Sequence, residues 1–112
     1  MGPQKPDNYQ AFFIMYYCYI LYSHSLDRYY IGSTSLDPSE RLLRHLEKYY
    51  ESSKFTAKAN DWVLYVEIPC SSFVQARKIE SHIKSMKSKK YIANLKQYPE
   101  IIQKLLDKYP DS

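Results

Sequence analysis

Two apolar, tyrosine-rich runs separated by a short polar stretch stand near the start of the chain. Residues 14–22 and 28–32 are rich in aromatic and β-branched side chains, and polar residues dominate positions 23–27 between them. Such side chains favour strands, and a five-residue connection is too short to make two strands parallel. The pattern therefore predicts an antiparallel β-hairpin.

A helix start follows the hairpin. Asp37 is a suitable N-cap, Pro38 suits the first helical position, and Glu40 completes a D-x-x-E capping pattern. The predicted helix continues through residues 49–50. Arg41 and His45 are four residues apart and therefore project from one face of it.

The next elements are a polar loop over residues 51–61, a strand over 62–68 and a second helix. Ser72 and Gln75 form a capping pattern that opens this helix, which extends to about residue 87. Glu80 lies at the edge of its apolar stripe, with Arg77 and Lys84 about one turn away on either side. The stripe itself consists of Phe73, Ala76, Ile79, Ile83 and Met86.

The C-terminal part reads as a short basic connector over residues 88–94 and a last helix that begins at Pro99 and ends before Pro110. The order of elements is ββαβαα. It predicts an α/β (α+β) fold in which helices flank a small three-stranded antiparallel sheet. We expect a disordered leader over residues 1–10, one domain over 11–96, and a C-terminal helix over 97–110 that packs on it.

Composition changes this picture little, but charge adds a candidate partner. The length of 112 residues suits one domain, and the net charge is +4. Between residues 77 and 96, seven basic residues stand against one acid. A basic stretch of this kind indicates a polyanionic partner, although a solvated helix face gives the same pattern.

Cys18 and Cys70 lie in apolar surroundings without metal-ligand spacing, which favours buried, reduced thiols in a cytoplasmic protein. The polar start does not resemble an export signal. The apolar run over residues 11–22 is too short to span a bilayer, so we expect no membrane partner.

A set of polar residues spread over these elements resembles the signature of the GIY-YIG nuclease superfamily. Residues 17–19 (YCY) occupy the GIY place, and residues 30–32 (YIG) form the second triplet. The helix with Arg41 and His45 follows, and then the single Glu80. The resemblance covers residues 16–94 and is closest to small, stand-alone bacterial members, which are similar to the N-terminal domain of the excision-repair incision subunit.

The resemblance implies a divalent-metal-dependent endonuclease that hydrolyses DNA. Glu80 would hold one Mg²⁺ (or Mn²⁺) ion. Tyr19 would act as general base or position the water, and Tyr30 would orient that water or contact phosphate. Arg41 would stabilise transition-state charge, and His45 would contact phosphate or assist proton transfer.

Further residues are candidates for binding the nucleic-acid backbone: Gly32, Ser33, Lys58, Arg77, Lys84, Lys87, Lys89, Lys90 and Asn94. No helix-turn-helix, zinc-finger or aromatic RNA-binding signature is visible in the sequence, so we expect selection of DNA structure rather than sequence, in repair or recombination. RNA remains open as a substrate. We expect no organic cofactor, and a monomer or weak homodimer.

Ordinary structural roles are the alternative interpretation of the same residues. Tyr19 and Tyr30 are also good sheet-packing residues, Gly32 also suits a strand end, and Glu80 is also placed to pair with Lys84. The same fold is also compatible with a module that binds nucleic acid without cutting it. A tyrosine base poses a chemical difficulty as well, because its ordinary pKa is ~10. Arg41, Lys58 and a bound metal are the groups that would lower it.

Overall fold

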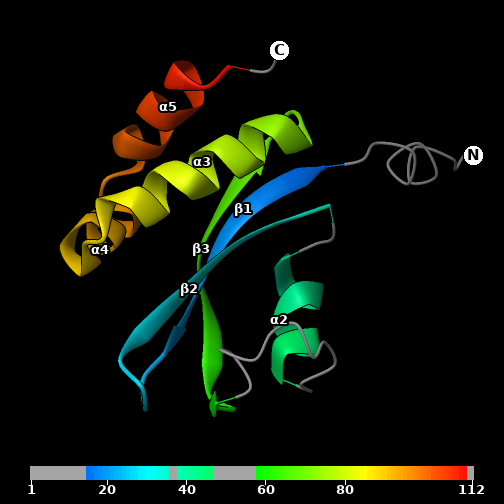
Figure 1. The fold of residues 1–112 in the computed structure, drawn as a ribbon, viewed down its shortest axis with the longest axis vertical. Coiled ribbons are helices and arrows are strands. Elements are labelled where there is room, and N and C mark those ends of the chain that lie inside the picture. Colours follow the sequence, from blue (N-terminus) through cyan, green and yellow to red (C-terminus); the bar gives the residue numbers. More distant parts are fainter. Residues whose placement is uncertain (1–14, 36–37, 47–57, 111–112) are drawn as a thin grey trace, which may run out of the picture.

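The computed structural model describes residues 15–35, 38–46 and 58–110, and its centre is a three-stranded sheet (Figure 1). The strands are β1 (Tyr16–Ser23), β2 (Arg28–Thr34) and β3 (Trp62–Cys70), in the order β2-β1-β3 with both neighbours antiparallel to β1. The predicted hairpin and the α+β fold class are therefore confirmed. The predicted leader and the predicted last turn of the first helix lie outside the described residues.

The two faces of the sheet carry different helices (Figure 1). Helix α2 (Pro38–Leu46) covers one face, and α3 (Phe73–Met86) covers the other. Alternation along β1 supplies both cores, because successive side chains of a strand point to opposite faces. Cys18 and Ile20 are buried with α3, whereas Tyr19 and Leu21 are buried on the side of α2.

A β-bulge in the edge strand β3 changes which face of the sheet its alternate side chains point to. Ile20 pairs with Val66 but the next residue of β1, Leu21, pairs with Leu64, so Tyr65 is an extra residue. Consequently Leu64 packs on the α2 side while Val66, two positions later, packs under α3.

Helix α3 begins as predicted, because the Ser72 hydroxyl accepts a hydrogen bond from the Gln75 backbone N–H. Three residues of the predicted apolar stripe (Ala76, Ile79 and Ile83) are buried. Phe73 and Met86, the first and last residues of the helix, are 41% and 44% exposed. Phe73 and Met86, although part of the apolar stripe, therefore lie outside the buried core.

The predicted connector over residues 88–94 is also wrong, since these residues lie in helix α4 (Lys89–Gln97). The Ser88 hydroxyl caps it by accepting from the Tyr91 backbone N–H, and Ile92 and Leu95 are buried. Two apolar positions three residues apart, flanked by lysines, give too weak a periodic signal to predict a helix.

Helix α5 (Pro99–Lys108) starts at the predicted proline and packs beside α3 and α4 (Figure 1). Its Leu105 is buried in the α3-side core. The Gln75 amide nitrogen donates to the carbonyl oxygens of Leu106 (3.4 Å) and Tyr109 (2.7 Å). These bonds fix the end of α5 against the start of α3.

Candidate active site

Tyr19 and Gly32 are neighbours across the hairpin and depend on each other. They are register partners in β1 and β2, and Tyr19 is fully buried. A Cβ atom on Gly32 would lie 2.7 Å from the Tyr19 hydroxyl oxygen and 2.8 Å from its Cζ. Gly32 does not have a positive φ. The glycine is therefore required because the tyrosine ring approaches the backbone of β2 closely.

Arg41 and Tyr30 complete this side of the site. The Arg41 Nε donates to the Tyr19 hydroxyl oxygen at 3.4 Å, and the Tyr19 and Tyr30 rings lie 6.3 Å apart between centroids. Arg41 is positioned by the first turns of α2, which begins at the buried Pro38. Three of the sequence-predicted residues thus meet on the α2 side of the sheet.

Glu80 joins the group from α3, on the opposite side of the sheet. The Ser33 hydroxyl donates to Glu80 Oε1 at 2.5 Å and also contacts the Ala76 carbonyl oxygen at 3.2 Å. Ser33 follows Gly32 directly, and the two residues face opposite sides of the edge strand β2. The strand therefore contacts Tyr19 through Gly32 and Glu80 through Ser33, so both halves of the candidate site meet at one sheet edge.

Two cations already pair with Glu80. The Lys84 ammonium lies 2.6 Å from Glu80 Oε2, and Arg77 Nε lies 3.6 Å from Oε1. The Glu80 side chain is 13% exposed, whereas those of Arg77 and Lys84 are 63% and 55% exposed. The ion pair with Lys84 that the sequence also allowed is therefore present, alongside the contact with Ser33.

Burial dominates the ionisation of Tyr19. It raises the pKa of Tyr19 to about 12, although the hydrogen bond and positive charge of Arg41 act in the opposite direction. Tyr30 and Glu80 add smaller upward contributions to this pKa. Arg41 therefore lowers the pKa of Tyr19 as expected, but desolvation of the phenolate is the larger effect and sets the net direction.

This shift predicts a loss of stability at alkaline pH. The neutral phenol stabilises the fold at every pH below about 10, and that contribution is lost as the pH rises from about 10 to about 12. Two pKa units correspond to about 2–3 kcal/mol. Urea unfolding between pH 8 and 12 should show a smaller alkaline decline for Tyr19→Phe than for the wild type. Parallel declines would contradict the assignment.

The remaining sequence-predicted residues are distributed along the molecule. His45 lies in α2, but its side chain is outside the described part, and Lys58 is exposed in the loop before β3. Lys87 caps α3 in the left-handed conformation, and Lys90 is exposed. The Lys89 ammonium contacts Asp27 at 2.9 Å and so secures the hairpin turn. The backbone carbonyl of Asn94 accepts from Tyr98 at the end of α4.

A second cluster was not found from the sequence. Phe73, His82 and Tyr109 line a pocket on the outer side of α3, and His82 Nδ1 lies 2.9 Å from the Tyr109 hydroxyl oxygen. His82 and Tyr109 are 27 residues apart, so no local pattern links them. In the sequence, Phe73 is one member of the apolar stripe of α3, and nothing local connects it with His82 or Tyr109.

The hairpin, α2 with Arg41 and α3 with Glu80 meet at one sheet edge, around β2. The family model of the GIY-YIG catalytic domain matches residues 15–92, and the chain belongs to this family. Membership supports a nuclease-type function in general, with nucleic acid as substrate. Searches of curated proteins and of solved structures found no significant match.

None of the helices in residues 15–35, 38–46 and 58–110 is long and apolar enough to cross a membrane. Within the same ranges, no three His, Cys, Asp or Glu side chains gather as a ready-made metal site.

Proposed function

We propose that this chain is a divalent-metal-dependent endonuclease that hydrolyses DNA phosphodiester bonds. The observation that carries the proposal is the meeting of Tyr19, Arg41 and Glu80 around the edge strand β2, where Gly32 and Ser33 contact the first and the last of them. A phenol, a guanidinium and a carboxylate at one edge supply a water-orienting group, a charge-stabilising group and a hard-cation ligand.

The residues present fit a single hard cation such as Mg²⁺ or Mn²⁺. Glu80 offers carboxylate oxygens and is partly exposed, and water and substrate phosphate would supply the other ligands. When bound, such an ion polarises phosphate and stabilises the leaving oxygen. Lys84 occupies the same carboxylate at 2.6 Å and would compete with it. This competition supports weak metal binding in the absence of DNA.

The protein's own groups then have distinct roles. The high pKa of Tyr19 keeps it a neutral phenol near pH 7, which favours positioning of the attacking water over removal of its proton. The Arg41 guanidinium beside it would stabilise the additional phosphate charge of the transition state. Tyr30, 6.3 Å from Tyr19 between ring centroids, would orient the same water or contact a phosphate. His45 on α2 is the candidate for a further phosphate contact.

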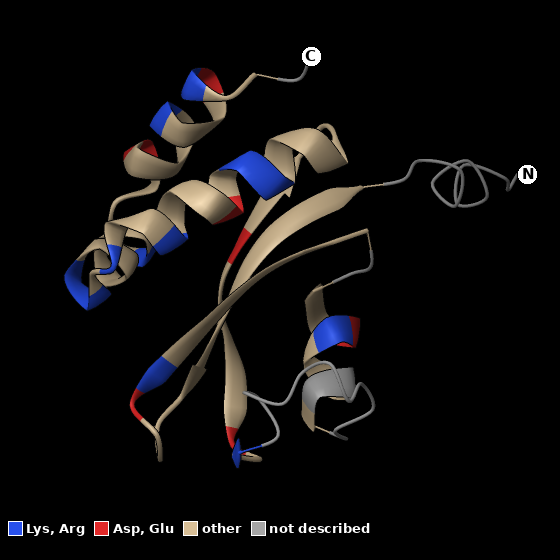
Figure 2. Ribbon diagram, viewed as in Figure 1, with Lys and Arg blue, Asp and Glu red and all other residues tan. Residues whose placement is uncertain are grey.

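The substrate proposal rests on charge. Lysine and arginine recur along α3 and α4 (Figure 2), and backbone phosphates are the natural partners of such a surface. We include Arg77, Lys84, Lys87 and Lys90 in this surface, whereas Lys89 is held by Asp27. Selection by DNA structure, with a role in repair or recombination, is consistent with this backbone-directed surface. Cys18 and Cys70 are buried free thiols, which supports a reducing compartment such as the bacterial cytoplasm.

Cleavage of labelled DNAs tests the function. A panel of duplex, single strand, nick, flap and four-way junction, each incubated with Mg²⁺, Mn²⁺ or chelator, should show metal-dependent strand scission of at least one substrate. The structure also offers a reason for a second candidate, since two cations already neutralise Glu80. Folded protein that binds these DNAs and cuts none of them would support a binding module.

Replacing Tyr19 by phenylalanine should lower the cleavage rate by at least about tenfold. The attacking water would lose one hydrogen bond, and a hydrogen bond in a charged environment contributes about 1.5–3 kcal/mol. Tyr22→Phe is the matched control. It removes a hydroxyl from the same strand, but one that donates to Asp27 at the hairpin end. The measurement is the initial cleavage rate of each variant on the best substrate. Equal rates for the two variants would exclude a role for the Tyr19 hydroxyl.

A further inference from the structure

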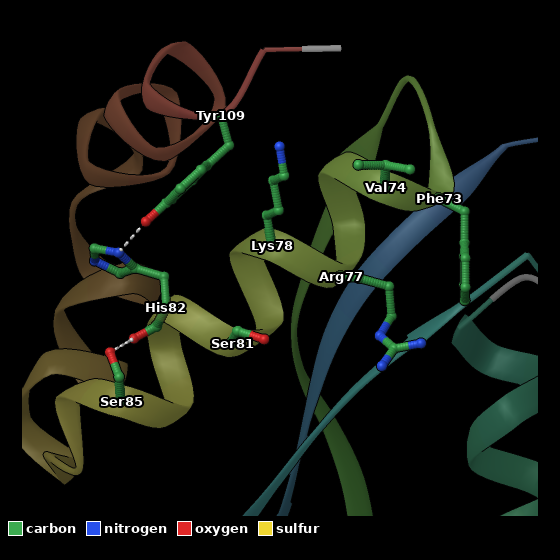
Figure 3. A pocket seen from close by; sticks show the side chains of 8 residues that line it. All are labelled: Phe73, Val74, Arg77, Lys78, Ser81, His82, Ser85 and Tyr109. Atoms are coloured by element: carbon green, nitrogen blue, oxygen red, sulfur yellow. Dashed lines mark hydrogen bonds between the residues drawn. The ribbon is translucent and has the colours of Figure 1, made fainter. Parts of the chain in front are cut away.

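We propose that the pocket on the outer side of α3 is a binding site for a single-stranded nucleic-acid segment. It is an open groove of about 680 Å³ between the exposed face of α3 and Tyr109 at the end of α5 (Figure 3). This volume lies in the range of sites that accept small organic ligands such as a nucleotide. The inference rests on the proposed function, because it assigns the position of one part of the substrate.

The wall formed by Tyr109 lies outside the GIY-YIG catalytic domain match, which ends at residue 92. Tyr109 is held in place by two contacts with α3. Its carbonyl oxygen accepts from the Gln75 amide, and its hydroxyl lies 2.9 Å from His82 Nδ1. The groove is therefore built jointly by the catalytic domain and by the C-terminal helix of this chain.

Aromatic rings border the groove at both ends. Figure 3 shows Phe73 at one end and Tyr109 with His82 at the other, with Lys78 between them. Phe73 is 41% exposed, and its ring packs on Tyr16 at 5.9 Å between centroids. An exposed aromatic ring that is held by a neighbouring ring can stack a base, and stacking is available only where bases are unpaired.

The charges of the groove favour a polyanion over an apolar peptide. Arg77 and Lys78 line it, and no carboxylate is among the lining residues. Lys108 adds a cation near its rim, with its ammonium 5.8 Å from the centre of the Tyr109 ring. Phosphates between stacked bases would thus meet lysine and arginine.

Arg77 connects the groove to the candidate active site. It lines the groove, lies 5.7 Å from the centre of the Phe73 ring, and pairs with Glu80 at 3.6 Å. A strand bound along α3 would therefore pass directly beside Glu80. This path fits substrates that present a single strand next to the cleaved bond, such as a flap.

Binding of a fluorescein-labelled oligothymidylate and of a matched duplex, measured by anisotropy in chelator, tests the site without cleavage. The variants are Phe73→Leu, which keeps apolar packing but removes the stacking ring, and Lys78→Gln. Lys104→Gln, exposed on α5 and outside the groove, is the control. We expect Phe73→Leu to weaken single-strand binding by about 5- to 150-fold, the range for one stacked base, with little change for duplex.

Lys78→Gln should weaken single-strand binding and reduce its salt dependence, whereas Lys104→Gln should do neither. Circular dichroism establishes that each variant is folded. Wild-type affinity in both groove variants would overturn the proposal, and so would an equal loss of affinity in the control. Sedimentation that shows the groove to be only a contact between two copies of the chain would overturn it as well. If groove variants lose the single strand while no DNA is ever cut, the groove stands and the nuclease proposal fails.

Discussion

Glu80→Gln is expected to lower metal-dependent cleavage by about 10³-fold, the upper range for loss of one electrostatic group in an active site. Glutamine keeps the size of the side chain and can still accept the Ser33 hydroxyl hydrogen bond, which in the wild type is 2.5 Å long. It removes the negatively charged oxygen that would bind a divalent cation. The chemistry should therefore be lost while the geometry at the edge of β2 is retained.

The fold should tolerate this change. The two cations that pair with Glu80, Arg77 and Lys84, are mostly exposed and can be solvated when the carboxylate is gone. We expect no loss of DNA affinity in chelator, because Arg77 and Lys84 remain in place, and loss of Mn²⁺ binding in calorimetry. Glu100→Gln, an exposed acid in the first turn of α5, is the matched control. Cleavage by Glu80→Gln at the wild-type rate would remove this residue from the mechanism.

The parts of the fold that sequence predicted are those determined by local signals. The hairpin, the Ser72 cap and the Pro99 helix start each depend on residues within a few positions of one another. Helix α4 was missed although Ser88 caps it, because its buried face contains only Ile92 and Leu95. Burial against a distant element, rather than intrinsic pattern, determines that helix.

The candidate site shows the same division. Tyr19, Tyr30, Arg41 and Glu80 were selected from the sequence by resemblance, and the structure brings them to one sheet edge. The bridge from Ser33 to Glu80 spans 47 residues, so its geometry has no local signature. The high pKa of Tyr19 depends on how completely the ring is buried, which a strand pattern does not determine.

Gly32→Ala is expected to destabilise the protein by about 1–3 kcal/mol, the usual cost of overpacking a core. On backbone grounds alone the sign would be opposite, because alanine is favoured over glycine in a strand by about 0.5–1 kcal/mol. The added Cβ would lie 2.7 Å from the Tyr19 hydroxyl oxygen and 2.8 Å from its Cζ, and Tyr19 is a fully buried ring. The clash therefore decides the sign.

The same substitution should reduce cleavage by about 10²-fold or more, because a shift of about 1 Å in Tyr19 would also disturb its 3.4 Å contact with Arg41. A double-mutant cycle separates the clash from other causes. In a Tyr19→Leu background the ring is absent, so Gly32→Ala should cost little or become stabilising by the ~0.5–1 kcal/mol of strand preference. Urea unfolding of the four proteins measures the coupling. An equal loss of stability in both backgrounds would mean that Gly32 is needed for the backbone conformation of β2 and not to make room for the Tyr19 ring.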